Sequence, residues 1–234
     1  KMERLVRSIC DYRNSGMDVC LVSSGAIAVG RDVIGIKERP SDISIKQACA
    51  AVGQGRLMMT YQKLFSEYNQ NSGQVLMTKN TIVNPVSRRN VMNTFEELFD
   101  LNVVPIVNEN DTVAIDELEL EMGENDSLAA VVATIANADL LIIMSDIDGL
   151  YDSDPRQNPD AKMIPVVREI SEDIHAVAGG AGTKFGTGGM ATKIHAVEIA
   201  YESDIDVVLM NGQHPKKLYE LFEDKPVGTL FHKG

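Results

Sequence analysis

A glycine-rich segment near the C-terminus carries the residues best suited to bind a phosphate. It runs from Lys184 to Lys193 (KFGTGGMATK) and leads into a helical pattern. Glycines let backbone N–H groups approach a phosphate closely, and the N-terminus of a helix adds positive potential. Lys193 can neutralise a phosphoryl group during transfer. Neither GxxxxGK[ST] nor GxGxxG is present. The alternative, a flexible surface loop, leaves the lysine unexplained.

Two clusters of carboxylates and amides indicate a second chemistry, the binding of an amino group. Asn108 to Asp111 follow an apolar strand pattern, and Glu124 to Asp126 precede a helical pattern. Four consecutive polar side chains at the end of an apolar strand are costly to bury unless they are paired. Carboxylate and amide oxygens bind ammonium groups well. A plain helix N-cap at Asp126 remains an alternative.

Two serine-containing segments complete the candidate residues. Ser23 to Ala26 (SSGA) follow a strand pattern and open a helix, so their amides and hydroxyls can face an anion. Ser145 and Asp146 end the most apolar strand pattern of the chain and can contact a nucleotide. The alternatives are a helix cap at Ser24 and an ordinary turn after Ser145.

The elements that must position these residues alternate between helix and strand. This alternation predicts one α/β domain with a mainly parallel sheet sandwiched between helices, in which ligands bind at the carboxyl ends of the strands. Asp111 to Gly123 alternate apolar and acidic residues, which predicts a short hairpin projecting from the sheet edge. Strand patterns occupy 18–23, 74–78, 103–107, 140–145 and 205–210, and helical patterns occupy 2–9, 45–68, 91–101, 127–138, 191–201 and 215–222.

Composition excludes several classes of protein. The 234 residues are 44% hydrophobic, which is ordinary for a globular domain, and no apolar run is long enough to cross a bilayer. The net charge of −12 argues against a broad nucleic-acid surface. Three scattered cysteines predict reduced core thiols in a cytoplasmic protein. The histidines have no metal-ligand spacing, so we expect no protein-built metal site.

Taken in order, these segments resemble the amino acid kinase family along the whole chain. The matching segments are 22–27 (VSSGAI), 107–111 (VNEND), 123–126 (GEND), 145–151 (SDIDGLY), 186–193 (GTGGMATK) and 227–231 (VGTLF). Within the family, the resemblance implies ATP-dependent phosphorylation of the side-chain carboxylate of L-glutamate. The products would be γ-glutamyl phosphate and ADP, in the first step of proline biosynthesis. It also implies ATP and Mg²⁺ as cofactors, a homo-oligomer and feedback inhibition by proline.

The same resemblance implies a role for each matching residue. Lys193 would stabilise the transferred phosphoryl group, and Asp126 would orient the catalytic lysines. Ser24, Asp111 and Asn125 would hold glutamate. The nucleotide would contact Ser145, Asp146, Thr187, Gly188, Gly189, Met190, Ala191, Thr192 and Lys193.

One departure concerns the start of the chain. Members of the family open with a strand and a glycine loop that carry a second catalytic lysine, and Lys1 precedes a helical pattern instead. We therefore expect residues 1–234 to form an amino acid kinase domain that lacks its first strand, with no RNA-binding-like extension. Two alternatives stay open: a kinase of the same fold acting on aspartate, acetylglutamate, carbamate or a nucleotide, and a non-catalytic ligand-sensing module.

Overall fold

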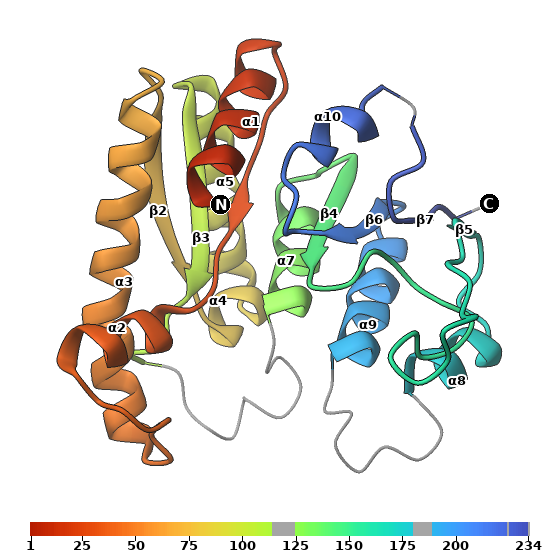
Figure 1. Cartoon of the computed structure of the whole chain (residues 1–234). Coiled ribbons are helices and arrows are strands. Elements are labelled where there is room, and N and C mark those ends of the chain that lie inside the picture. Colours follow the sequence, from red (N-terminus) through yellow and green to blue (C-terminus); the bar gives the residue numbers. More distant parts are fainter. Residues whose placement is uncertain (114–124, 180–188, 224, 234) are drawn as a thin grey trace. The chain divides into compact units, whose positions relative to one another are not determined.

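The computed structural model describes residues 1–113, 125–179, 189–223 and 225–233, which divide into two compact units (Figure 1). We call Met2–Asn125 the N-unit and Asp126–Gly234 the C-unit; Lys1 groups with the latter. Each unit has its own sheet, three-stranded in the N-unit and four-stranded in the C-unit. In the described part of the chain, no helix combines the length and hydrophobicity of a membrane span.

The N-unit is a parallel sheet between helices. Its strands are ordered β1-β3-β2, and both pairings are parallel. Helices α1 and α3 share a core cluster with β3, formed around Phe65, Val104 and Ile106, while α5 contacts β3 separately. The elements are α1 (Met2–Asn14), β1 (Leu21–Val22), α2 (Ala26–Ile34), α3 (Ile43–Ser66), β2 (Asn71–Met77), α4 (Lys79–Val83), α5 (Pro85–Asp100) and β3 (Val103–Glu109).

A proline explains why β1 is shorter than the predicted strand 18–23. The register pairs Leu21 with Ile106 and Val22 with Val107, so the next pairing towards the N-terminus would require the backbone N–H of Pro105. Proline has no N–H, and a ladder cannot extend past that position. The strand therefore begins at Leu21.

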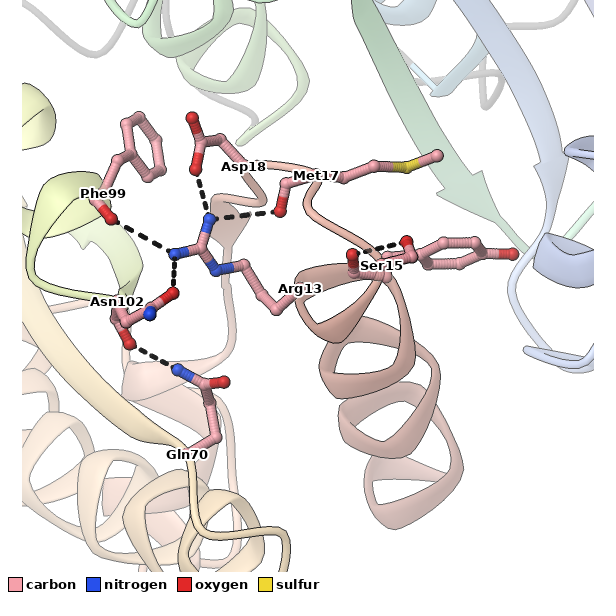
Figure 2. A network of polar contacts seen from close by, with 8 residues as sticks. Arg13, Ser15, Met17, Asp18, Gln70, Phe99 and Asn102 are labelled. Carbon is pink, nitrogen blue, oxygen red and sulfur yellow. Dashed lines mark hydrogen bonds and ion pairs between the residues drawn. The ribbon is translucent and has the colours of Figure 1, made fainter.

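A buried arginine links the segments that precede β1 and β3. It lies at the amino ends of these strands, whereas polar segments of the predicted site lie at their carboxyl ends. The Arg13 guanidinium donates to Asp18, to the Phe99 carbonyl at 3.2 Å and to the Asn102 side chain at 2.7 Å (Figure 2). The Arg13 side chain is only 5% exposed. It thus fixes the end of α1 against the turn that leads from α5 into β3.

The C-unit contains a mixed sheet ordered β4-β6-β7-β5, in which only the β6–β7 pairing is antiparallel. Its core cluster joins α7 and α9 to β4 and β6, with Ile194, Leu209 and Phe231 fully buried. The elements are α7 (Asn125–Ile135), β4 (Leu140–Ser145), β5 (Val166–Val167), α8 (Glu172–Gly179), α9 (Gly189–Tyr201), β6 (Asp206–Asn211), α10 (Lys217–Leu221) and β7 (Thr229–Phe231).

One buried threonine joins β7 to the loop after β4. The Thr229 hydroxyl accepts from the Leu150 amide at 2.8 Å and donates to the Ile164 carbonyl at 2.7 Å. A Cβ on Gly228 would lie 2.0 Å from the Leu209 carbonyl oxygen, and the φ of +69° also favours glycine. These contacts of β7 hold in place the loop that follows Ser145.

The α/β architecture with mainly parallel strands is confirmed, and so are the predicted helices and strands, with shifts at their ends. The expectation of a single sheet is wrong, because the described strands form two sheets, one in each unit. The short elements α4, β5, α8 and β7 were not predicted. The predicted hairpin 111–123 lies outside the described residues from residue 114 onwards.

Cys10 and Cys49 are buried free thiols and Cys20 is half-buried. Burial and the neighbouring Asp11 charge raise the pKa of Cys10 to about 11. Burial also raises the pKa of Cys20 to about 12.

Candidate functional site

In the N-unit, two of the predicted polar segments leave neighbouring strands at the same edge of the sheet. β1 and β3 run parallel, with Val22 opposite Val107, and the Ser23 amide donates to the Val107 carbonyl at 2.8 Å. Ser24 follows β1 by two residues, and Asp111 follows β3 by two residues. Because parallel strands end at a common edge, their loops start side by side.

The loop after β1 exposes Ser24 rather than using it as a cap. Gly25 occupies the N-cap position of α2 with a φ of +90°, and no side chain caps the helix there. The helix-cap alternative for Ser24 is therefore wrong, and Ser24 is exposed next to the N-terminus of α2. Its neighbour Ser23 is buried and hydrogen-bonded to the Tyr61 hydroxyl at 3.1 Å.

The polar cluster at the end of β3 leads into a tight turn, and its first residue, which still belongs to the strand, faces inwards. Asn108 is 2% exposed, and its side chain bonds to the Glu109 amide and to Gln54 of α3. Asn108 is therefore internal structure and not a ligand-facing member of its cluster. The Asn110 amide donates to the Met77 carbonyl at 2.7 Å, and the Val113 amide donates to the Asn110 carbonyl at 3.1 Å. Asp111 lies within this turn.

In the C-unit, tertiary structure joins two candidate residues that are 67 positions apart. Lys193 Nζ lies 2.8 Å from Asp126 Oδ2, and the side chains are 13% and 18% exposed. Thr192 donates to the same carboxylate oxygen at 3.4 Å. Asp126 stands in the first turn of α7, where the helix dipole favours its negative charge. It is thus more than an N-cap, because it holds the ammonium group of Lys193.

The glycine-rich segment is described only from Gly189 onwards, where α9 begins. Met190, Ala191 and Thr192 follow in its first turn, and Lys193 lies one turn into the helix. The predicted nucleotide contacts Thr187 and Gly188 lie outside the described residues. Asn125 is the first residue of α7 and directly precedes Asp126.

Ser145 and Asp146 lie at the carboxyl end of β4, as predicted. The Ser145 hydroxyl donates to Asp146 Oδ1 at 3.2 Å, and Arg156 lies 3.4 Å from Asp146 Oδ2. Both charged side chains of this ion pair are about 70% exposed, so the contact contributes little to stability. The Asp146 carboxylate is therefore accessible to a ligand from the solvent side, and Ser145 beside it is half-buried.

Further polar residues gather at this strand end that the sequence reasoning did not assign. Asn211 ends β6 opposite Ser145, and its amide donates to Asp148 Oδ1 at 3.0 Å. Lys217 Nζ lies 3.8 Å from the same carboxylate. The sequence could have indicated Asn211 as a candidate, because Asn211 stands at the end of a buried strand just as Ser145 does.

A hollow of roughly 230 Å³ adjoins Asp148 within the C-unit. Its lining mixes apolar side chains with one lysine and two carboxylates, and its volume is below the range usual for small-molecule pockets. The lining residues are Asp148, Tyr151, Met163, Lys217, Glu220, Pro226, Val227 and Gly228.

Comparison with known proteins gives one family. The model of the amino acid kinase family matches residues 1–211. The chain is 51% identical over 231 residues to the glutamate 5-kinase of Clostridium acetobutylicum, covering 99% of this chain and 86% of that protein. It is 46% identical over 235 residues to the glutamate 5-kinase of Enterococcus faecalis, covering 100% and 87%.

A solved structure with a similar fold is the isopentenyl phosphate kinase of T. acidophilum in its product complex. The TM-score is 0.63 over 98% of this chain and 91% of that chain, with 19% identity. At this identity the likeness shows the fold alone.

Proposed function

This chain belongs to the amino acid kinase family, and we propose that it transfers the γ-phosphoryl group of ATP to the side-chain carboxylate of L-glutamate. The products are γ-glutamyl phosphate and ADP, in the first step of proline biosynthesis. The observation that carries this function is about 50% identity to glutamate 5-kinases over 99% of the chain. The chain is thus an enzyme, and its reaction consumes ATP.

The reaction requires charge neutralisation more than a base. A glutamate side chain has a pKa near 4.3, so the attacking carboxylate is already ionised at neutral pH. It must approach the polyanionic triphosphate, and the repulsion between them has to be offset. Lys193 supplies a positive charge for the transferred group. Asp126, 2.8 Å from its Nζ, holds the ammonium group in place before the substrates bind.

Glutamate binding is assigned to Ser24, Asp111 and Asn125. Asp111 and Asn125 offer oxygens for the α-ammonium group, and the exposed hydroxyl of Ser24 can donate to a carboxylate. The support for this assignment is positional. Ser24 and Asp111 leave adjacent parallel strands at one edge of the N-unit sheet. Asn125 directly precedes the residue that holds Lys193.

The nucleotide is assigned to the C-unit. The first turn of α9, from Gly189 to Thr192, presents backbone N–H groups that no helical carbonyl accepts, and these can bind phosphate oxygens. Ser145 and Asp146 offer a hydroxyl and a carboxylate that can bind the hydroxyl groups of a ribose. Thr187 and Gly188 keep their assignment to the nucleotide from the sequence.

Mg²⁺ is proposed to accompany ATP. In residues 1–113, 125–179, 189–223 and 225–233, no three His, Cys, Asp or Glu side chains gather as a metal cage. This fits a cation that binds through the substrate phosphates and its own waters, with few protein ligands. Bound in this way, Mg²⁺ would supply further positive charge. We also propose that the protein is a cytoplasmic homo-oligomer and that proline inhibits it. Proline added to the ADP-release assay described next would test the inhibition.

The test is an ADP-release assay with glutamate, aspartate, N-acetylglutamate, carbamate and a nucleoside monophosphate as acceptors. Hydroxylamine is added in parallel, because it converts an acyl phosphate into a stable hydroxamate. We expect ADP and hydroxamate in equal amounts with glutamate, and only background release with the others. Activity with another acceptor and none with glutamate would overturn the assignment. No activity with any acceptor would favour a ligand-sensing module.

A further inference from the structure

A glutamine of α3 touches the turn that carries Asp111, from the inner side of the N-unit. The Asn108 side chain donates through Nδ2 to Gln54 Oε1 at 2.8 Å. Its Oδ1 already accepts from the Glu109 amide at 3.0 Å. The backbone amide therefore fixes which end of the Asn108 amide faces Gln54. Gln54 must present its oxygen, so it acts as an acceptor.

This contact controls the start of the turn. Asn108 is 2% exposed, so its side chain has little access to water that could replace a lost partner. Two residues on, the Asn110 amide donates to the Met77 carbonyl of β2 at 2.7 Å. Thr112 closes the turn by donating to Asn110 Oδ1 at 2.6 Å. The backbone around Asp111 is thus attached to β2 on one side and to α3, through Gln54, on the other.

The helix that carries Gln54 is itself held firmly. A Cβ on Gly53 would lie 1.8 Å from the Ala26 carbonyl oxygen, and a Cβ on Gly30 would lie 1.7 Å from the Cys49 carbonyl oxygen. The backbones of α2 and α3 are therefore in direct contact, which only glycine allows at these two positions. Since α2 begins directly after Ser24 and Gly25, α3 is a fixed support for both loops of this sheet edge.

We propose that Gln54 is a positioning residue for glutamate. Through Asn108 it sets the turn in which Asp111 meets the substrate. The inference rests on the proposed function, because it takes Asp111 as a contact of glutamate. Loss of the acceptor leaves the buried Nδ2 unpaired, the Asn108 side chain reorients and the Glu109 amide loses its partner. The carboxylate of Asp111 then moves away from its binding position, while nothing in the C-unit changes.

The experiment compares three variants of the full chain. Gln54→Met keeps the length of the side chain and removes the acceptor, whereas Gln54→Glu keeps an acceptor oxygen. Gln62→Met makes the same replacement at an exposed position two turns along α3 and serves as the matched control. We expect Gln54→Met to raise KM for glutamate about tenfold, with KM for ATP within twofold. Gln54→Glu and Gln62→Met should stay within threefold of the wild type.

Hydrogen exchange of the segment 103–113 gives a readout that does not depend on activity. We expect faster exchange in Gln54→Met and unchanged exchange in the other two variants. If Gln54→Met is insoluble, Gln54→Asn replaces it, because its shorter side chain does not reach Asn108.

The outcomes separate this proposal from the proposed function. An unchanged KM for glutamate in Gln54→Met overturns the positioning role, as does an equal rise in both KM values with a lower melting temperature. Loss of activity in Gln54→Glu equal to that in Gln54→Met also overturns it. A wild type without glutamate kinase activity refutes the proposed function instead, and exchange in 103–113 still decides whether Gln54 holds the turn.

Discussion

Lys193→Met removes the positive charge that we propose for the transferred phosphoryl group. In the ligand-free protein this charge is paired with Asp126 at 2.8 Å, and both side chains are mostly buried. At this separation the coulombic attraction is about 6 kcal/mol with an effective dielectric constant of about 20. The desolvation of the two groups offsets most of that attraction. The pair therefore contributes little to the free energy of unfolding.

The transition state should be affected far more than the fold. Loss of one charged group that acts on developing charge typically lowers kcat by about 10²–10³, or about 2.7–4 kcal/mol. The carboxylate left behind stands in the first turn of α7, where the helix N-terminus partly compensates its charge. We therefore expect the free energy of unfolding to change by no more than about 1–2 kcal/mol.

The assay is steady-state ADP release at saturating ATP and glutamate, with urea unfolding in parallel. Lys162→Met, an exposed lysine of the C-unit, is the matched control and should keep the wild-type kcat. Asp126→Asn should lower kcat about tenfold, because Lys193 keeps its charge and loses its anchor. A Lys193→Met enzyme with kcat within threefold of the wild type, or with only KM altered, would refute the catalytic role.

Four further predictions concern binding, stability and pH. Asp111→Asn keeps the size of the side chain and removes its charge, so KM for glutamate should rise about tenfold with KM for ATP unchanged; equal rises would indicate a folding defect. Arg13→Met removes the hydrogen bonds that the buried guanidinium donates to the Phe99 carbonyl and to Asn102, and should lower the free energy of unfolding in urea by about 2 kcal/mol, whereas Arg7→Met on the exposed face of α1 should not. Thr229→Val should cost about 1–3 kcal/mol in the same measurement, and Thr229→Ser, which keeps the hydroxyl, clearly less. Burial raises the pKa of Cys10 from 9.0 to about 11, so its contribution to stability is complete below pH 9 and is lost as the pH rises towards 11; the decline should be smaller in Cys10→Ala.

The alternation of helices and strands could be read from the sequence because it depends on local patterns. Each long element buries one face, so its apolar residues recur with the period of that element. The conformations of the turns that precede β2, β3, β4 and β6 also depend on local sequence. Each contains an Asn or Asp with a positive φ, a conformation that these residues tolerate better than most others; they are Asn69, Asn102, Asn137 and Asp204. Short elements such as β5 and β7 have too few residues for a period to appear.

The positions of the candidate site were also available from the sequence. The strand patterns predicted that Ser24 and Asp111 follow the carboxyl ends of strands and that Ser145 lies at such an end, which is where parallel sheets bind their ligands. The roles of Asn125 and Asp126 came from their match to the family pattern. The same match linked Asp126 to the catalytic lysines. What the other residues contact could not be predicted, since a motif fixes the type and order of side chains and not their partners.

Only the tertiary structure decided which distant groups meet. Lys193 and Asp126 come from different helices, and no local pattern records their 2.8 Å contact. Asn108 stands in a polar cluster by sequence, yet it faces inwards to Gln54, which is 54 residues away. Pro105 shortens β1 through a hydrogen bond that it cannot make across the sheet. In each case the deciding energy belongs to a pair of groups that become neighbours only after folding, so their separate local sequences carry no trace of it.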